Sequence, residues 1–432
     1  MFKKFHVFRL LIIFFFLAST YAFGAFSVKY SIFPFGYQIS HWFSWTFQQL
    51  NTSKTHLSQS QINVETYAQN IQTLLFDFDI KWISVSSEEI YGAIIPITKD
   101  SILHISQYGM ITWKNLLTGK NFNHNIPNLE LNSNEFELFT LKNKITSAHS
   151  AFGVKDAQII NSGENTSTII VSATYFDTFN DCVDLRVFSI QLSTPKSGWK
   201  QLFVSKPCIN SYDGMPSWGG GLAANGKHSV YLTIGDVLHD GVNNKDLVSD
   251  RDSDYGKIFD INLETQSYQI HSIGHRNPQG IIKTAQNLLL AVEHGPEGGD
   301  ELNLILEGKH YGWPLVTFGV DYGSFKWPSN KKNGSHQGYE QPIMTWTPAI
   351  GPSDLDEVVS TKKNAIWEND IIISGLRSHS LLRLKLNNKS VIFIEEIDIG
   401  RRLRKIKTLD RTVFLKDAIT GEIGYFVIPY QN

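Results

Sequence analysis

The feature that most constrains this chain is a repeated unit. A β-rich run leads to a small or polar residue, a loop follows, and a second β-rich run returns. The clear copies lie at 168–192, 228–263, 287–306, 370–386 and 412–428, and the segment 82–145 supplies a further copy. Units of this kind at spacings of roughly 40 to 80 residues are typical of β-propellers with insertions, and a β-sandwich does not repeat them. The sequence therefore predicts an all-β, six-bladed propeller over 81–430.

Composition is consistent with this fold and excludes one class of partner. The chain has 32 glycines and 10 tryptophans, and 42% of its residues are hydrophobic, which suits many short strands around a sizeable core. The formal net charge of −2 gives no basis for binding nucleic acid. A small-molecule or saccharide ligand is the expected partner, and the oligomeric state is left open.

The N-terminus reads as a targeting segment over 1–27. Basic residues precede an apolar run, and residues 10–27 are about long enough to cross a bilayer. Either a cleaved signal peptide or a retained signal anchor fits this pattern. Both place the body of the protein in the periplasm or outside the cell, with this segment as the only membrane contact. Residues 28–80 are predicted to be a stalk or linker.

Two cysteines, Cys182 and Cys208, are the only ones in the chain. In an oxidising compartment such a pair is a disulfide candidate. The alternative is two unrelated buried thiols, and the export signal favours the disulfide.

The segment 271–322 is the richest in chemistry-bearing residues. Gly295 and Pro296 begin a loop that can present backbone carbonyls, and the carboxylate of Glu301 follows. Carbonyls with a carboxylate form a ligand set that Ca²⁺ prefers. A tight loop with an ordinary ion pair explains the same residues without a metal. In a propeller, loops of this kind from several blades converge at one end of the central channel.

Three motifs in this segment, HRNPQG, EHGPEGGDELN and KHYGWP, resemble the soluble glucose and aldose sugar dehydrogenase family in order and spacing. The resemblance is dense over 215–322, resumes over 340–428 and is absent before residue 145. It implies a six-bladed propeller that oxidises aldoses with pyrroloquinoline quinone and calcium. Calcium would polarise the quinone so that it accepts hydride from a sugar carbon.

The resemblance also implies roles for individual residues. Glu301 and Tyr311, with the Gly295-Pro296 loop, match the calcium-binding positions of the family. The quinone-binding positions that it implies are Arg276, Asn277, Gln279, Tyr322, Arg377, Arg402, Arg404 and Asp417. Paired arginines suit the three carboxylates of the quinone, because a guanidinium binds a carboxylate through two hydrogen bonds.

A simpler interpretation of the basic run GRRLRK is a set of surface charges. The alternation of Arg402 and Arg404 about Leu403 favours one shared face of a strand, without saying which face.

The departures from the family concern catalysis. In the stretch MPSWGGGLAANG, Ser217 stands where the family has its histidine base and Gly221 where it has an arginine. In HSAFGVKDAQI, which resembles a Gln-Gly-Gly-Leu-Leu-Asp segment, Ala151 replaces a quinone-contacting glutamine. A serine cannot act alone as a base near neutral pH. His379 and Asp417 are weak substitutes.

Three functions follow from this pattern. The first is a quinoprotein sugar dehydrogenase with a substitute base. The second is a catalytically inactive ligand- or saccharide-binding propeller that keeps the calcium site. The third is a different chemistry, such as hydrolysis, in the rebuilt half of the pocket.

Overall fold

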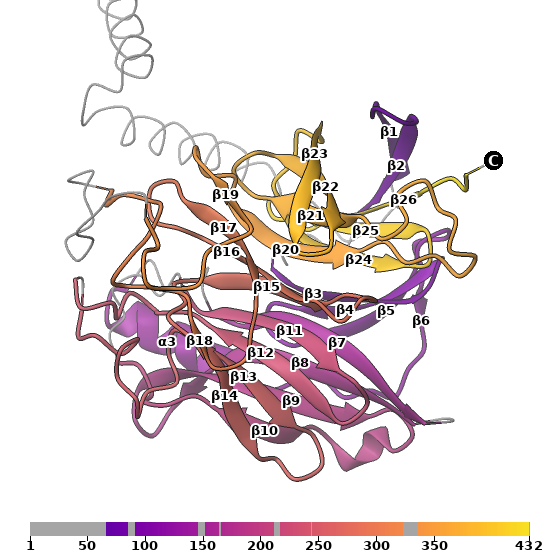
Figure 1. Cartoon of the computed structure of the whole chain (residues 1–432). Coiled ribbons are helices and arrows are strands. Elements are labelled where there is room, and N and C mark those ends of the chain that lie inside the picture. The colour runs from indigo at the N-terminus through magenta and orange to yellow at the C-terminus, as the bar shows by residue number, and fades with distance from the viewer. Residues whose placement is uncertain are drawn as a thin grey trace, which may run out of the picture. The chain divides into compact units, whose positions relative to one another are not determined.

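The computed structural model describes residues 66–84, 91–145, 152–163, 166–210, 217–242, 244–322 and 335–431. The predicted targeting segment, Ala151 and most of the predicted stalk lie outside these ranges. Within them, six antiparallel sheets follow one another along the chain (Figure 1). The innermost strand of each sheet contacts the innermost strands of its two neighbours, and this closes a ring. The prediction of a six-bladed propeller is confirmed.

Blades are numbered here in chain order. Blade 1 contains β3 (Gly92–Thr98), β4 (Ser101–Ser106), β5 (Ile111–Asn115) and β6 (Asn121–Phe122). Blade 2 contains β7 (Val154–Gly163), β8 (Thr166–Asp177), β9 (Cys182–Gln191) and β10 (Lys200–Val204). Blade 3 contains β11 (Gly219–Asn225), β12 (Ser229–Ile234), β13 (Lys257–Asn262), β14 (Tyr268–Ile273) and the short parallel strand β18 (Lys309–His310). Among the described residues, two helical segments lie between strands, α3 (Ser133–Lys142) and a 3-10 turn (Pro195–Ser197).

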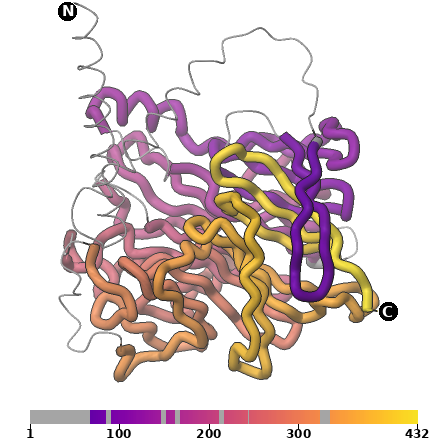
Figure 2. The backbone as a smooth tube through the Cα atoms, turned by 90° about the horizontal axis from the view of Figure 1, so that it is seen from above, coloured from indigo at the N-terminus to yellow at the C-terminus, as the bar shows by residue number. Residues whose placement is uncertain are grey.

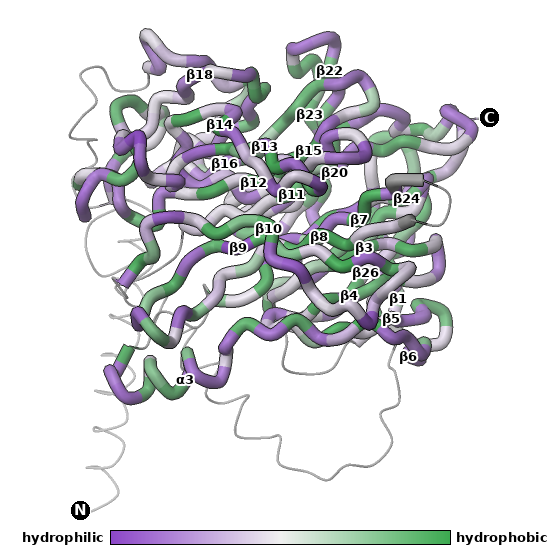
Figure 3. Tube along the Cα trace, turned by 90° about the horizontal axis from the view of Figure 1, so that it is seen from below, coloured by the Kyte–Doolittle hydropathy of each residue, from purple (hydrophilic) through white to green (hydrophobic). Residues whose placement is uncertain are grey.

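The remaining blades follow the same plan. Blade 4 contains β15 (Pro278–Lys283), β16 (Leu289–Glu293), β17 (Asp300–Leu304) and β19 (Met344–Trp346). Blade 5 contains β20 (Pro352–Glu357), β21 (Ile371–Gly375), β22 (Ser380–Asn387) and β23 (Ser390–Asp398). Blade 6 contains β24 (Leu403–Leu409), β25 (Thr412–Asp417), β26 (Ile423–Val427), β2 (Phe78–Ile83) and β1 (Thr66–Ile71). In Figure 3, green hydrophobic segments run along strands such as β8 and β23, and many connecting loops are purple.

Blade 6 corrects the predicted domain boundary. Residues 66–80, assigned from the sequence to the stalk, form β1 and the start of β2, and β2 pairs with β26. Figure 2 shows this indigo hairpin beside the yellow C-terminal segment. Burial alternates through Phe78–Ile80, the pattern of a strand with one buried face. The hairpin thus joins the N-terminal part of the propeller to its last blade and closes the ring.

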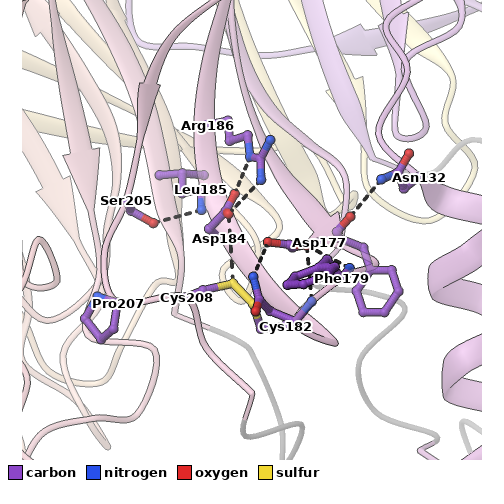
Figure 4. The surroundings of a disulfide bond; sticks show 12 residues. Asn132, Asp177, Phe179, Cys182, Asp184, Leu185, Arg186, Ser205, Pro207 and Cys208 are labelled. Carbon is purple, nitrogen blue, oxygen red and sulfur yellow. Dashed lines mark hydrogen bonds and ion pairs between the residues drawn. A yellow bond between two sulfur atoms is a disulfide. The ribbon is translucent and has the colours of Figure 1, made fainter.

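A disulfide joins Cys182, at the start of β9, to Cys208, which follows β10 (Figure 4). Beside it, Arg186 binds Asp184 through two hydrogen bonds of 2.6 and 2.9 Å. The bond therefore links the third strand of blade 2 to the segment that leads towards blade 3.

Four buried charged side chains meet in the central channel. Lys405 Nζ lies 3.1 Å from Asp156 Oδ1, and Lys407 Nζ lies 3.3 Å from Asp354 Oδ2. The lysines also approach the opposite carboxylates, at 3.8 Å for Lys405–Asp354 and 3.5 Å for Lys407–Asp156. Blades 2 and 5, which carry the carboxylates, are three positions apart in the ring. The quartet therefore ties opposite sides of the channel together.

The quartet stands between two ends of the channel. At the far end, where the innermost strands finish, a cavity with about 800 Å³ of free space, part of it open to solvent, is lined by every innermost strand. Its walls include Ile95, Ala157, Ala223, Ile282, Asp356 and Thr408. The other end, where the innermost strands begin, carries the candidate site.

We expect Lys405→Met to destabilise the protein by about 3–5 kcal/mol, because it leaves two buried carboxylates sharing one lysine. Urea unfolding measures the change. Lys200→Met, an exposed lysine on β10, is the matched control and should shift stability by less than about 0.5 kcal/mol. Equal stability of Lys405→Met and the parent would show that the quartet does not hold the channel together.

Candidate functional site

Strand direction brings distant loops to one end of the channel. Loops that precede an innermost strand, and loops that join the second strand of a blade to the third, lie at the same end. Arg276 and Arg402 belong to loops of the first kind. Gly295, Arg377 and Asp417 lie at or beside loops of the second kind. The sequence-predicted residues therefore share one end of the propeller although they are far apart in the chain.

This end is marked by a repeated irregularity. Among the described strands, five of the six innermost ones carry a β-bulge immediately after their first residue. We call this the bulge end. The bulged residues are Lys155, Gly220 with Gly221, Gln279, Ser353 and Arg404. A bulge leaves its residue outside the ladder and redirects the side chain, so these positions are available to a site rather than to the sheet.

Three arginines at the bulge end act electrostatically on the imidazole of His294. Arg276 Nη1 donates hydrogen bonds to the carbonyls of Gly295 (2.7 Å) and His294 (3.2 Å). Burial, together with Arg276, Arg404 and Arg402, lowers the pKa of His294 to about 3. His294 is therefore neutral at physiological pH. Its Nε2 donates to the carbonyl oxygen of Pro352 at 2.8 Å.

Within the described ranges, the three arginines act without a direct carboxylate partner, although Asp236 lies within electrostatic reach of Arg276 and Asp354 within that of Arg404. Among the described residues, no ion pair joins Arg276, Arg402 or Arg404 to a carboxylate. The buried Nε of Arg276 has no hydrogen-bond partner in the described part of the chain. A bound anion would supply both a direct ionic partner and the missing acceptor, so the donor set fits a polycarboxylate.

A cleft beside this cluster unites four of the predicted residues. It is narrow, with only about 10 Å³ accessible to the centre of a water molecule. Arg276, Gly295, Glu301 and Tyr311 all line it, together with Glu293, His294, Trp313, Val316, Thr317 and His336. The Arg276 guanidinium lies 5.4 Å from the ring centroid of Trp313, a cation–π contact. Pro296 follows Gly295 in the same loop but does not line the cleft.

The predicted calcium side chains are bound to protein partners. Glu301 Oε1 lies 3.1 Å from His336 Nε2, and its Oε2 accepts a 3.0 Å hydrogen bond from Asn303. Burial raises the pKa of Glu301, and the Glu301 carboxylate raises the pKa of His336 against the effect of burial. The Tyr311 hydroxyl donates to the Leu304 carbonyl at 2.5 Å. The described residues contain no group of three or more His, Cys, Asp or Glu side chains placed to hold a metal.

Asn277 and Gln279 do not line the cleft but lie beside His294, which does. Gln279 Nε2 donates to Asn277 Oδ1 at 2.6 Å, and both side chains are buried. Asn277 Nδ2 lies 3.4 Å from His294 Nδ1, the acceptor nitrogen of the neutral ring. These amides therefore connect the bulge of β15 to the arginine cluster.

Other predicted residues lie at the bulge end but outside the cleft. Tyr322 is 59% exposed. Arg377 is exposed and pairs with Glu297 at 3.3 Å. Asp417 Oδ2 pairs with Arg401 at 2.8 Å, and its Oδ1 accepts the backbone N–H of Ile419. Asp417 thus binds the arginine next to the predicted one. His379 is exposed and adopts a left-handed backbone with φ 58°.

Two of the residues predicted to depart from the family pattern, Ser217 and Gly221, lie within the described ranges. Ser217 is buried before β11, and its carbonyl accepts the N–H of Val237 at 3.2 Å. At Gly221, a Cβ would lie 3.0 Å from the Gln279 carbonyl oxygen of the next blade. A larger residue at 221 therefore requires the neighbouring strand to move.

Sequence analysis missed Asp236, a buried carboxyl in the loop after β12. Its Oδ2 accepts a 2.9 Å hydrogen bond from Trp313 Nε1, and its Oδ1 accepts the N–H of Leu238 at 3.0 Å. Burial raises its pKa to about 7, while Arg276 acts in the opposite direction. The repeat pattern marks the end of this strand, but only the fold brings Trp313 to it.

The fold and site together define a six-bladed propeller with a cationic cleft at one end of its channel. The chain belongs to the glucose/sorbosone dehydrogenase family, whose model matches residues 139–423. Aldose sugar dehydrogenase YliI of Escherichia coli is 31% identical over 207 residues, 44% of this chain and 54% of the relative. Quinoprotein glucose dehydrogenase B of Acinetobacter calcoaceticus is 28% identical over 192 residues, 31% of this chain and 40% of the relative. The chain thus matches about half or less of these curated relatives.

Solved structures agree on the fold. The apo-form of soluble aldose sugar dehydrogenase from Escherichia coli has a TM-score of 0.65 at 21% identity, covering 82% of this chain and all of that one. The PQQ-bound form of aldose sugar dehydrogenase from Streptomyces coelicolor has a TM-score of 0.57 at 18% identity, covering 85% of this chain and all of that one.

The raised pKa of Asp236 predicts a pH-dependent effect of Asp236→Asn. The Asp236 carboxyl has a pKa of about 7 when folded and an ordinary pKa of 3.8 when unfolded, so its ionisation lowers the free energy of unfolding as pH rises between those values. The full cost is up to about 4 kcal/mol at 1.36 kcal/mol per pKa unit. Relative to the parent, the variant should therefore gain stability from pH 5 to pH 8. Thermal unfolding at both pH values measures this gain.

Asp252→Asn, at an exposed position in the same loop, is the control and should show no such trend. A stability difference between Asp236→Asn and the parent that does not change with pH would contradict the assignment.

Proposed function

We propose that this chain is an exported, quinoprotein sugar dehydrogenase-like propeller that binds pyrroloquinoline quinone at the bulge end. One observation carries the proposal. Arg276, Arg402 and Arg404 all act electrostatically on one neutral histidine, and none of them forms an ion pair with a carboxylate of the described residues. The names of relatives in the same family include a quinoprotein and a PQQ-bound form, which supports the same ligand class.

Each residue has a defined task in this proposal. The arginines stay charged at physiological pH and would hold the carboxylates of the quinone. His294, Asn277 and Gln279 would fix the polar edge of the cleft through their mutual hydrogen bonds. When bound, the quinone supplies the hydride acceptor that amino-acid side chains lack.

The proposal includes a calcium ion that is bound mainly by backbone oxygens. The Gly295 and Pro296 carbonyls and Glu301 are the expected ligands, and the ion would have to displace Arg276 Nη1 from the Gly295 carbonyl and His336 from Glu301. The Tyr311 hydroxyl is engaged by Leu304 and is not expected to ligate. The proposal of export rests on the predicted N-terminal segment, which lies outside the described residues. Within the described ranges, no helix is long and apolar enough to span a membrane.

The serine at the predicted position of the catalytic base supports a second candidate, a catalytically inactive ligand- or saccharide-binding propeller. Ser217 occupies the family's base position and is buried. The substitutes named from the sequence are an exposed histidine, His379, and a carboxylate held by Arg401, Asp417. Neither lines the described cleft. Removal of the sugar hydroxyl proton would then lack a positioned acceptor.

We expect the purified protein to bind quinone but to oxidise aldoses at a rate about 10²–10⁴ below that of a complete site, the usual contribution of a general base. Reconstitution with pyrroloquinoline quinone and calcium, followed by absorbance titration and a dye-linked aldose assay, tests both parts. Arg402→Met should weaken quinone binding. Arg251→Met is the matched control, because Arg251 is exposed in another loop at the bulge end.

Each part of the proposal has its own contrary outcome. Absence of a quinone difference spectrum would overturn the cofactor assignment. Rapid, quinone-dependent aldose oxidation would overturn the argument from Ser217. Calcium should raise the melting temperature by mass action, and equal melting in calcium and in chelator would remove the metal from the proposal.

A further inference from the structure

The cavity at the far end of the channel, called here the far-end cavity, is much roomier than the cleft at the bulge end. About 260 Å³ of it is accessible to the centre of a water molecule. A single water needs about 10–15 Å³ on this measure, so a small organic molecule fits. The lysine–aspartate quartet separates this cavity from the cleft, and a ligand here would therefore bind independently of one at the bulge end.

The wall of the far-end cavity is mostly apolar. Aliphatic side chains from all around the ring line it, among them Ile95 of blade 1, Leu222 of blade 3, Ile282 of blade 4 and Leu409 of blade 6. The polar lining residues are Gln158, Lys283, Asp356, Lys407 and Thr408. An apolar wall with a few polar groups is typical of small-molecule sites, and the charged groups decide which ligand is recognised.

Both lysines that line the far-end cavity are bound to other partners. Lys407 Nζ lies 3.3 Å from Asp354 and 3.5 Å from Asp156 within the quartet. Lys283 Nζ donates a 2.8 Å hydrogen bond to Asn225 Oδ1 at the end of β11 in blade 3. An anionic ligand would have to compete with these partners for either amine.

Asp356 is the charged lining residue that has no ion pair of its own. It lies two residues beyond Asp354 on β20, on the far side of the quartet. Its Oδ2 accepts the N–H and the hydroxyl of Thr408 at 2.6 and 3.2 Å, and its Oδ1 accepts the N–H of Glu357 at 2.9 Å. Among the described residues no lysine or arginine pairs with Asp356, and Lys407, which acts on it electrostatically, also balances the two aspartates of the quartet.

We propose that the far-end cavity binds a small organic ammonium ion, with the charged group on Asp356 and the apolar body against the aliphatic wall. A carboxylate oxygen has room for more than one donor, so Oδ1 can accept the ammonium beside the Glu357 N–H. The ammonium supplies an ionic partner for Asp356, and the resulting hydrogen bond is charge-assisted. A neutral ligand of the same shape would cover this carboxylate without that compensation.

Binding should depend on the ionisation of Asp356. Burial raises the pKa of Asp356 to about 6 against the opposing effect of Lys407, and Asp354 adds to the rise. The other charged groups beside it are Glu357 on the same strand and Lys283 on β15, which also lines the cavity. Because the ammonium requires the carboxylate form, affinity is full above this pKa and falls as pH falls through it. At pH 5 about one tenth of the carboxyl is ionised, so affinity should be about tenfold lower than at pH 8.

The test measures binding by isothermal titration calorimetry at pH 8 with three probes of matched shape, namely cyclohexylamine, cyclohexanol and cyclohexanecarboxylate. The amine should bind about tenfold or more tightly than the alcohol, the usual contribution of a charge-assisted hydrogen bond, and the carboxylate should bind most weakly. Asp356→Asn keeps the shape and an acceptor for Thr408, so it should lose the preference for the amine while it still binds the alcohol. Asp252→Asn, which removes an exposed carboxylate in a loop at the bulge end, is the control and should bind like the parent.

Several results would overturn the proposal. These are equal affinity of the parent for amine and alcohol, a preference for the carboxylate, amine binding that Asp356→Asn leaves undiminished, and absence of binding by any probe. The parent alone gives a further test, because the amine stays charged from pH 5 to pH 8. A loss of amine affinity at pH 5, with alcohol affinity unchanged, supports the proposal even if Asp356→Asn does not fold. Equal amine affinity at both pH values would contradict it.

Discussion

The structure depends on how the bulged innermost strands satisfy their backbone groups. A bulge disrupts the ladder beside it, and a buried carbonyl left there must find another partner. The preceding blade supplies that partner: Thr233 Oγ1 donates to the Pro278 carbonyl at 2.7 Å, and Ser353 Oγ donates to the Leu403 carbonyl at 2.6 Å. His294 makes the equivalent bond to Pro352 at 2.8 Å. The contacts that hold neighbouring blades together are therefore the same contacts that position the site.

This arrangement gives the middle of the channel and its bulge end different charges. The quartet compensates Lys405 and Lys407 with Asp156 and Asp354 in the interior. The bulged Arg404, one residue before Lys405, is directed elsewhere, with a guanidinium 5.4 Å from the Tyr91 ring centroid. Neutral charge in the middle and excess positive charge at the bulge end follow from one strand, β24. A polycarboxylate is the ligand class that this asymmetry recognises best.

Sequence was sufficient for the architecture because each blade repeats the same unit, and the family motifs lie within single blades. It could not show that Asp417, predicted to bind the quinone, pairs with Arg401, because this pairing depends on the direction of each side chain. Closure by β2 was missed because its partner β26 lies at the other end of the chain. Asp236 was missed because Trp313 reaches it only through the fold. The calcium and quinone assignments stay predictions.

The central claim is that the bulge end is a polycarboxylate site built by the innermost strands. A crystal structure of the protein grown with pyrroloquinoline quinone tests it most directly. The account predicts carboxylate oxygens at roughly 2.7–3.2 Å from guanidinium nitrogens of Arg402 or Arg404, above the lysine–aspartate quartet. A quinone bound only in the far-end cavity or on the outer surface of the blades, with these arginines untouched, would contradict it.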